Sequence, residues 1–161
     1  MNEREYVIVA PHADDEIIGC YSLLIHKLVA KVLFGSLEAM GEAKKSQILF
    51  DYEIGHVFEL PESKIVSDKR TFLFPDPVYE LHPVHRELGA LGEKMLRNGY
   101  RVIFYSTNMN APYIHELKAS RGKLELLNEF YPEKSDLWKY DHKYFLFEGY
   151  TKWLINPIPN E

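Results

Sequence analysis

Two carboxylates and an imidazole lie within four residues of one another, directly after the first apolar run of the chain. His12, Asp14 and Asp15 follow the segment Tyr6–Ala10, and Glu16 comes next. Carboxylates this close repel one another, so the cluster is costly unless something compensates their charge. A divalent cation would do so, and zinc accepts imidazole and carboxylate ligands. We therefore expect His12 and Asp15 to bind a metal ion.

A third ligand has to come from another part of the chain. His82 and His85 form a His-x-x-His sequence at the start of a predicted helix, and we expect His85 to be the ligand. Zinc lowers the pKa of bound water towards about 7, and an unligated carboxylate can take the proton as the water attacks a carbonyl. Asp14 suits this role of general base. His82 is then left to stabilise the oxyanion or to protonate the departing amine.

Both clusters also have simpler interpretations. Asp14 or Asp15 could be a helix N-cap, and an acidic residue suits the first helical turn. This interpretation leaves His12 unexplained. His82 and His85 could be ordinary surface histidines at a helix N-terminus. The metal interpretation requires residue 85 to lie beside residues 12 and 15, around a pocket.

Further polar residues are candidates for binding a substrate. Asn108 and Asn110 lie in the predicted loop 106–112, after a strand, and could bind substrate hydroxyls. Local turn hydrogen bonds made by these asparagines are an equal alternative. Arg86, next to His85, could hold the substrate or lie on the helix surface. Cys20 is interpreted as a small buried residue of the first helix rather than a ligand.

The order of predicted elements favours an α/β fold. Strands are expected at residues 6–10, 31–34, 56–60, 101–105 and 143–147, and helices at 17–28, 38–52, 86–96 and 116–131. Residues 64–79 are predicted to be an irregular surface excursion, although 71–74 are apolar. This alternation predicts one domain over residues 1–161, a three-layer α/β/α sandwich with a mostly parallel, Rossmann-like sheet. In such sheets ligands bind at the carboxyl ends of strands, where residues 12–15 lie.

Composition limits the function classes. The net charge of the 161 residues is −5, with acidic residues spread along the chain, so a nucleic-acid partner is not expected. No apolar window approaches the roughly 20 residues of a membrane span. The single cysteine forms no internal disulfide, and the N-terminus lacks a signal-peptide pattern, so we expect a cytoplasmic protein. A nucleotide-binding Rossmann domain is not expected either, because the first turn lacks Gly-x-Gly-x-x-Gly.

Two motifs resemble those of the LmbE/PIG-L-like deacetylases. The string Val7-Ile-Val-Ala-Pro-His-Ala-Asp-Asp-Glu-Ile-Ile-Gly-Cys20 resembles the family's opening motif, a strand followed by Pro-His-Pro-Asp-Asp-Glu and a glycine-containing helix. His82-Pro-Val-His85 resembles its second motif, His-Pro-Asp-His. Lys44, Gln47 and Gly55 match in spacing a weaker pattern of Arg, Glu and Gly. The resemblance spans Tyr6 to about Arg97.

Members of this family are zinc-dependent hydrolases with a Rossmann-like fold, and they remove acetyl groups from N-acetylated amino sugars and related amides. The resemblance implies one zinc ion per subunit on His12, Asp15 and His85, with Asp14 as general base and His82 as its electrostatic partner. Lys44 becomes a further candidate for substrate binding. The expected partner is a small N-acylated molecule. Because the chain is shorter than most members, the loops that enclose the substrate could be trimmed, or another subunit of a homo-oligomer could supply them.

Two positions depart from the family pattern. Ala13 replaces the usual proline, which removes no functional group. Val84 replaces an aspartate thought to orient and charge the first histidine of the motif, so His82 lacks that neighbour. Asp76, Glu80 or Asp141 could substitute through space. Two alternatives to an N-deacetylase therefore stay open, namely a catalytically weakened metal- or sugar-binding member of the fold and a metal hydrolase of a different amide or ester.

Overall fold

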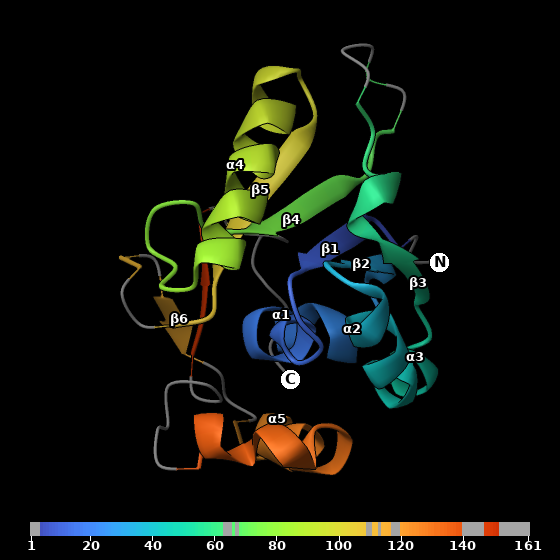
Figure 1. The fold of residues 1–161 in the computed structure, drawn as a ribbon, viewed down its shortest axis with the longest axis vertical. Helices are drawn as coiled ribbons and strands as arrows, with labels where there is room; N and C mark the ends of the chain where they lie inside the picture. The colour runs from blue at the N-terminus through green and yellow to red at the C-terminus, as the bar shows by residue number, and fades with distance from the viewer. Residues whose placement is uncertain are drawn as a thin grey trace.

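The computed structural model describes residues 4–62, 66, 68–108, 111–112, 114–116, 120–139 and 147–151. These residues form a seven-stranded sheet in the order β3-β2-β1-β4-β5-β7-β6, with helices on both faces (Figure 1). The strands are β1 (Tyr6–Ala10), β2 (Val29–Phe34), β3 (Glu53–His56), β4 (Thr71–Pro75), β5 (Arg101–Ser106), β6 (Ile114–Glu116) and β7 (Phe147–Tyr150). The helical segments are α1 (Asp15–Ile25), α2 (Leu37–Glu42), α3 (Lys44–Phe50), η1 (Val57–Glu59), α4 (Pro83–Arg97), α5 (Ser120–Phe130) and η2 (Pro132–Leu137).

The sheet is mostly parallel. β1 pairs in parallel with β2 and β4, β2 with β3, and β4 with β5. β7 runs antiparallel to β5, and β6 antiparallel to β7. The chain moves outward from β1 to β3 and then crosses back to place β4 on the other side of β1. The strand order therefore reverses between β1 and β4, and the crevice outside the carboxyl ends of such strands is the usual ligand site of open α/β sheets.

β1 is covered on both faces, as its continuous apolar sequence predicts. Ile8 and Ala10 belong to the core cluster on the side of α1 and α5, whereas Val7 and Val9 belong to the cluster on the side of α4. Figure 1 shows α4 on one face of the sheet and α1, α2 and α3 on the other. The predicted three-layer α/β/α arrangement is confirmed.

α4 lies unusually close to the sheet. A Cβ atom added to Gly89 would come within 2.5 Å of the Pro75 carbonyl oxygen, and one added to Gly92 within 2.6 Å of the Phe74 ring. Only glycine permits this approach without displacing β4. The two glycines thereby fix the helix that carries His85 against the strand beside β1.

The prediction of a surface excursion over residues 64–79 is wrong for its second half. Thr71–Pro75 form β4, a largely buried strand between β1 and β5. The Pro75-Asp-Pro77 sequence indicates a break, but Pro75 is the last residue of the strand, where the missing backbone donor matters little. The short apolar run at residues 71–74 is the sequence feature that indicates this strand.

The strand predicted at residues 56–60 is also wrong. β3 ends at His56, and Val57–Glu59 form the 3-10 segment η1. A reciprocal cap explains the turn, because His56 Nδ1 accepts the Phe58 N–H at 3.1 Å and the Glu59 carboxylate accepts the His56 N–H at 2.6 Å. Side-chain hydrogen bonds of this kind compete with strand pairing.

Other elements differ in extent. The helix predicted over 38–52 is split at Ala43 into α2 and α3, and the helix predicted over 116–131 is α5, preceded by β6. α1 and α4 begin before the predicted residues 17 and 86, and β2 begins before residue 31. The predicted strand 143–147 overlaps β7 only at Phe147, because residues 143–146 lie outside the described residues. Within the described ranges, every helix is too short or too polar to span a bilayer.

Candidate metal centre

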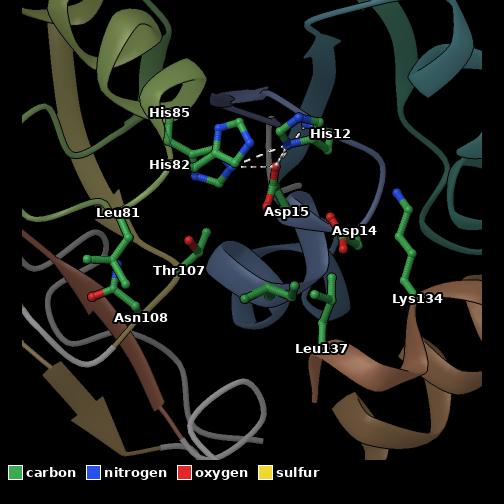
Figure 2. A pocket seen from close by; sticks show the side chains of 11 residues that line it. His12, Asp14, Asp15, Leu81, His82, His85, Thr107, Asn108, Lys134 and Leu137 are labelled. Carbon is green, nitrogen blue, oxygen red and sulfur yellow. Dashed lines mark hydrogen bonds and ion pairs between the residues drawn. The ribbon is translucent and has the colours of Figure 1, made fainter. Parts of the chain in front are cut away.

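Three ligand atoms from distant parts of the chain meet at the carboxyl end of β1. The distance from Asp15 Oδ2 is 3.3 Å to His12 Nδ1 and 3.2 Å to His85 Nε2, and the two histidine nitrogens are 3.3 Å apart (Figure 2). Neighbouring ligand atoms of a tetrahedral zinc ion are about 3.3 Å apart when the bonds are about 2.0–2.1 Å long. This group could therefore hold a metal ion, and its spacing and chemistry fit zinc.

The topology of the sheet brings these residues together. His12 and Asp15 lie in the connection from β1 into α1, and His85 lies in the first turn of α4, after β4. Because β1 and β4 are adjacent and parallel, both segments leave the same edge of the sheet at the point where the strand order reverses. Asp15 Oδ2 also accepts the His12 N–H at 2.8 Å, which fixes the loop. The predicted juxtaposition of residues 12, 15 and 85 is confirmed.

A buried carboxylate orients His85. Glu80 is 1% exposed, and its Oε1 lies 3.0 Å from His85 Nδ1. An ionised carboxylate only accepts hydrogen bonds, so Nδ1 carries the proton and Nε2 is left to face the metal site. Glu80 also accepts hydrogen bonds from Thr107 Oγ1 at 2.8 Å and from Asn108 Nδ2 at 2.6 Å. The carboxylate therefore links the loop after β5 to the candidate ligand His85.

We expect Glu80→Gln to weaken zinc binding by about 10–100-fold while the protein remains folded. The amide keeps the volume of the side chain but removes the negative charge that acts on His85. Zinc affinity is measured by competition with a chromogenic chelator. Glu87→Gln, an exposed glutamate of α4, is the matched control and should bind zinc like the parent. Equal affinity in the Glu80 and Glu87 variants would contradict the orienting role.

The charges of the cluster shift its pKa values. Burial alone would lower the pKa of His85, but the Asp15 and Glu80 carboxylates outweigh it and raise the pKa to about 10. Burial disfavours the charged form of Asp15 too, yet His85 and His12 hold its pKa below the usual value. Without a metal ion, the cluster is therefore a protonated histidine beside an ionised aspartate.

Zinc binding should consequently release a proton. The raised pKa of His85 keeps the metal-free site protonated up to about pH 10, and a ligating imidazole must be neutral. Zinc affinity should fall by about tenfold for each unit that the pH drops between 8 and 6. Calorimetry in two buffers of different ionisation enthalpy measures the protons released. A pH-independent affinity would show that the cluster is already deprotonated.

Asp14 has a strained backbone in the same loop. Its φ is 135°, a region that side-chain-bearing residues rarely adopt and that costs about 1–3 kcal/mol. The buried Glu16 carboxylate supports this conformation by accepting the Asp14 N–H at 3.0 Å, and it also accepts the hydroxyl of Tyr131. Asp14 precedes α1 but its side chain makes no capping hydrogen bond. Helix capping therefore does not explain this residue.

The Asp14 side chain instead lines a pocket that opens beside the three ligands. The pocket has a volume of about 390 Å³, and Figure 2 shows Asp14 next to Asp15 at its wall. Burial, followed by the charge of Asp15, raises the pKa of Asp14 well above its usual value. The lining residues are His12, Asp14, Asp15, Ile18, Leu81, His82, His85, Thr107, Asn108, Lys134 and Leu137.

His82 lies in the pocket wall next to the ligands. Its ring centroid is 5.0 Å from that of His12 and 5.3 Å from that of His85. Its Nδ1 accepts the N–H of Val84 at 3.1 Å, so the proton of the neutral ring is on Nε2. Burial, followed by the neighbouring imidazoles of His12 and His85, lowers the pKa of His82. This shift favours the neutral imidazole.

Three acids could have replaced the aspartate that the family has at residue 84, and those that the structure describes contact groups other than His82. Glu80 contacts His85 rather than His82. Asp76 Oδ1 accepts the N–H groups of Val78 and Tyr79 and so closes the turn after β4. Asp141 lies outside the described residues. Among those residues, the acid that favours protonation of His82 is the ligand Asp15.

Comparison with known proteins gives the fold and no activity. The chain is similar to the crystal structure of the conserved protein TT1542 from Thermus thermophilus, with a TM-score of 0.58 and 15% sequence identity over 93% of this chain and 94% of the other. Identity this low supports a shared fold alone. No protein-family model matches the chain, and no curated protein matches it.

Of the residues predicted to bind substrate, the structure places one in the pocket wall. Asn108 lines the pocket. Arg86 and Lys44 are exposed and are not among the lining residues. Asn110 lies outside the described residues. Cys20 is buried in α1, as expected.

The sequence analysis missed Lys134, Thr107 and the pocket leucines. Lys134, in η2, donates to the carbonyl oxygen of Ala13 and lies 3.7 Å from Glu42. Nothing local in the sequence indicates this contact across 121 residues. Thr107 could have been found, because it immediately follows β5 and so lies at the same strand edge as His12.

Proposed function

We propose that this protein is a zinc-dependent hydrolase that removes an N-acetyl or other N-acyl group from an amino sugar or a similar small molecule, as do the LmbE/PIG-L-like deacetylases. One observation carries the proposal. His12 Nδ1, Asp15 Oδ2 and His85 Nε2 have the mutual spacing of zinc ligands, and an unligated carboxylate, Asp14, lies next to them in a pocket.

The residues around this centre have the properties that amide hydrolysis needs. Zinc held by these ligands would acidify a water molecule and polarise the acyl oxygen. Asp14 accepts the proton of the attacking water at a carboxylate oxygen and later passes it to the departing nitrogen. The raised pKa of Asp14, caused by burial and by Asp15, brings its basicity closer to neutral pH, where such proton transfer is most efficient.

His82 serves as a neutral hydrogen-bond donor in this mechanism. The Val84 N–H occupies Nδ1 and leaves the Nε2–H to donate to the oxyanion of the tetrahedral intermediate. A backbone amide thus orients the ring where the family uses an aspartate. The resulting tautomer suits stabilisation of the oxyanion, and proton delivery to the amine is left to Asp14.

The proposal is tested with the purified full chain loaded with one equivalent of zinc. N-Acetyl amino sugars and simple N-acyl amines are supplied, and released amine and carboxylic acid are measured. We expect turnover with zinc, none after chelation, and recovery when zinc is restored. Ester substrates in the same assay separate an amidase from an esterase. Stoichiometric zinc without hydrolysis of any substrate would overturn the proposal.

Val84 supports a second candidate, a member of the fold that binds metal and small molecules but turns over slowly. Without an aspartate at residue 84, the acid among the described residues that favours protonation of His82 is Asp15, which is shared with the metal cluster. Val84 is 37% exposed, so an aspartate fits there without disturbing the core. In a weakened protein, Val84→Asp should raise kcat by about tenfold or more and leave zinc content unchanged. An unchanged kcat in an active protein would contradict the weakened candidate.

A further inference from the structure

We propose that the pocket binds an apolar group attached to the scissile amide rather than a fully hydroxylated sugar ring. This inference rests on the proposed function and narrows its substrate class. Two features of the described lining residues support it. Several of these residues are apolar, and the polar side chains among them, apart from those of the metal centre and the catalytic candidates, already make hydrogen bonds within the protein.

Part of the pocket wall is apolar. Leu81 comes from the connection between β4 and α4, and Leu137 from η2, and both line the pocket together with Ile18 of α1. In Figure 2, Leu81 lies at the left of the pocket, below His82, and Leu137 lies at its lower right. Leu81 is 65% exposed and Leu137 is 53% exposed. A ligand that covers them gains the free energy of removing apolar surface from water.

Apart from the three clustered ligands and the catalytic candidates Asp14 and His82, the polar side chains described in the pocket wall already have partners. The Thr107 hydroxyl donates to Glu80 at 2.8 Å. The Asn108 amide donates to Glu80 at 2.6 Å and to the Tyr79 carbonyl oxygen at 3.3 Å. The Lys134 ammonium donates to the Ala13 carbonyl oxygen. A site that selects a polyhydroxylated ring needs donors and acceptors directed at it, and these donors are directed into the protein.

The pocket is large enough for such a group. Its volume of about 390 Å³ lies within the range of roughly 300–1,000 Å³ typical of small-molecule sites. Each methylene group transferred from water to an apolar wall improves affinity by up to about fourfold. The apolar group could be the acyl chain or a substituent on the amine, because both adjoin the bond that the metal centre would cleave.

Hydroxamic acids test the inference by binding alone, because they ligate zinc and mimic the amide. The zinc-loaded full chain is titrated calorimetrically with aceto-, butyro- and octanohydroxamic acid, which extend the acyl side. A second series, acetohydroxamic acid with N-methyl, N-butyl and N-benzyl substituents, extends the amine side. We expect affinity to rise by up to about fourfold per added methylene in one series, and that series identifies the apolar side of the substrate.

Substitutions of two pocket leucines test the inference, and a leucine outside the pocket is the control. Leu81→Asn and Leu137→Asn should flatten the rising series, whereas Leu96→Asn, at a position 45% exposed on α4 and outside the pocket, should not. Two flat series in a protein that binds zinc would overturn this inference and leave the hydrolase proposal standing. A rise that survives both pocket substitutions would also overturn it. A chain that binds no zinc would overturn both proposals.

Discussion

Replacing Asp14 with asparagine should lower kcat for amide hydrolysis by about 10²–10⁴-fold and leave zinc content at the parent level. Asparagine has nearly the same shape as aspartate but cannot take a proton from water. Asp14 is not one of the three clustered ligand atoms, so its neutralisation removes no bond to the metal. Asparagine also tolerates positive φ better than most residues, which limits the damage to the strained loop.

The measurement compares kcat, KM and zinc content of the variant with those of the parent. Asp51→Asn is the matched control, because Asp51 also has a positive φ of 55° but lies exposed at the end of α3. Its ion pair with Arg4 is a surface pair and contributes little. A variant with parental kcat would remove Asp14 from the chemistry. Loss of zinc instead would make Asp14 a ligand.

The residues of the candidate site carry local signals in the sequence, whereas some of the strands and turns around them do not. An apolar run followed at once by His12, Asp14 and Asp15 is a local signal, and so is the spacing of His82 and His85. Their meeting depends on β1 and β4 being neighbours. The sequence does not predict that neighbour relation, because the five residues of β4 end in a proline and lie in a segment of irregular pattern.

The supporting residues could not be predicted for a different reason. Glu80 precedes α4, and it orients His85 because the first turn of α4 places that imidazole beside the Glu80 carboxylate. The loop after β5 supplies Thr107 as a further partner of the same carboxylate. Lys134 reaches Ala13 only because η2 packs near the loop after β1. Such contacts depend on the packing of layers rather than on periodicity or turn chemistry. Thus the catalytic candidates come from motifs, whereas the groups that position them come from tertiary structure.

Removing the imidazole of His85 should abolish stoichiometric zinc binding. His85 is the candidate ligand contributed by the second motif, and its Nε2 lies within 3.3 Å of the other two candidate ligand atoms. With His12 and Asp15 alone, the metal would keep two protein ligands, fewer than the three of known catalytic zinc sites. We expect His85→Ala to lose more affinity than the roughly 10–100-fold predicted for Glu80→Gln. Elemental analysis after gel filtration gives the zinc content.

Loss of zinc by unfolding must be separated from loss of a ligand. His85→Ala leaves the buried Glu80 carboxylate without its ring partner, and breaking a buried pair destabilises a protein by about 3–5 kcal/mol. His85→Gln restores a side-chain N–H for Glu80 without an imidazole, and thermal unfolding reports whether each variant is folded. His82→Ala should keep its zinc, because His82 is a pocket residue and not one of the clustered ligands. A folded His85→Gln protein with full zinc content would remove residue 85 from the metal centre, and the hydrolase proposal would lose its basis.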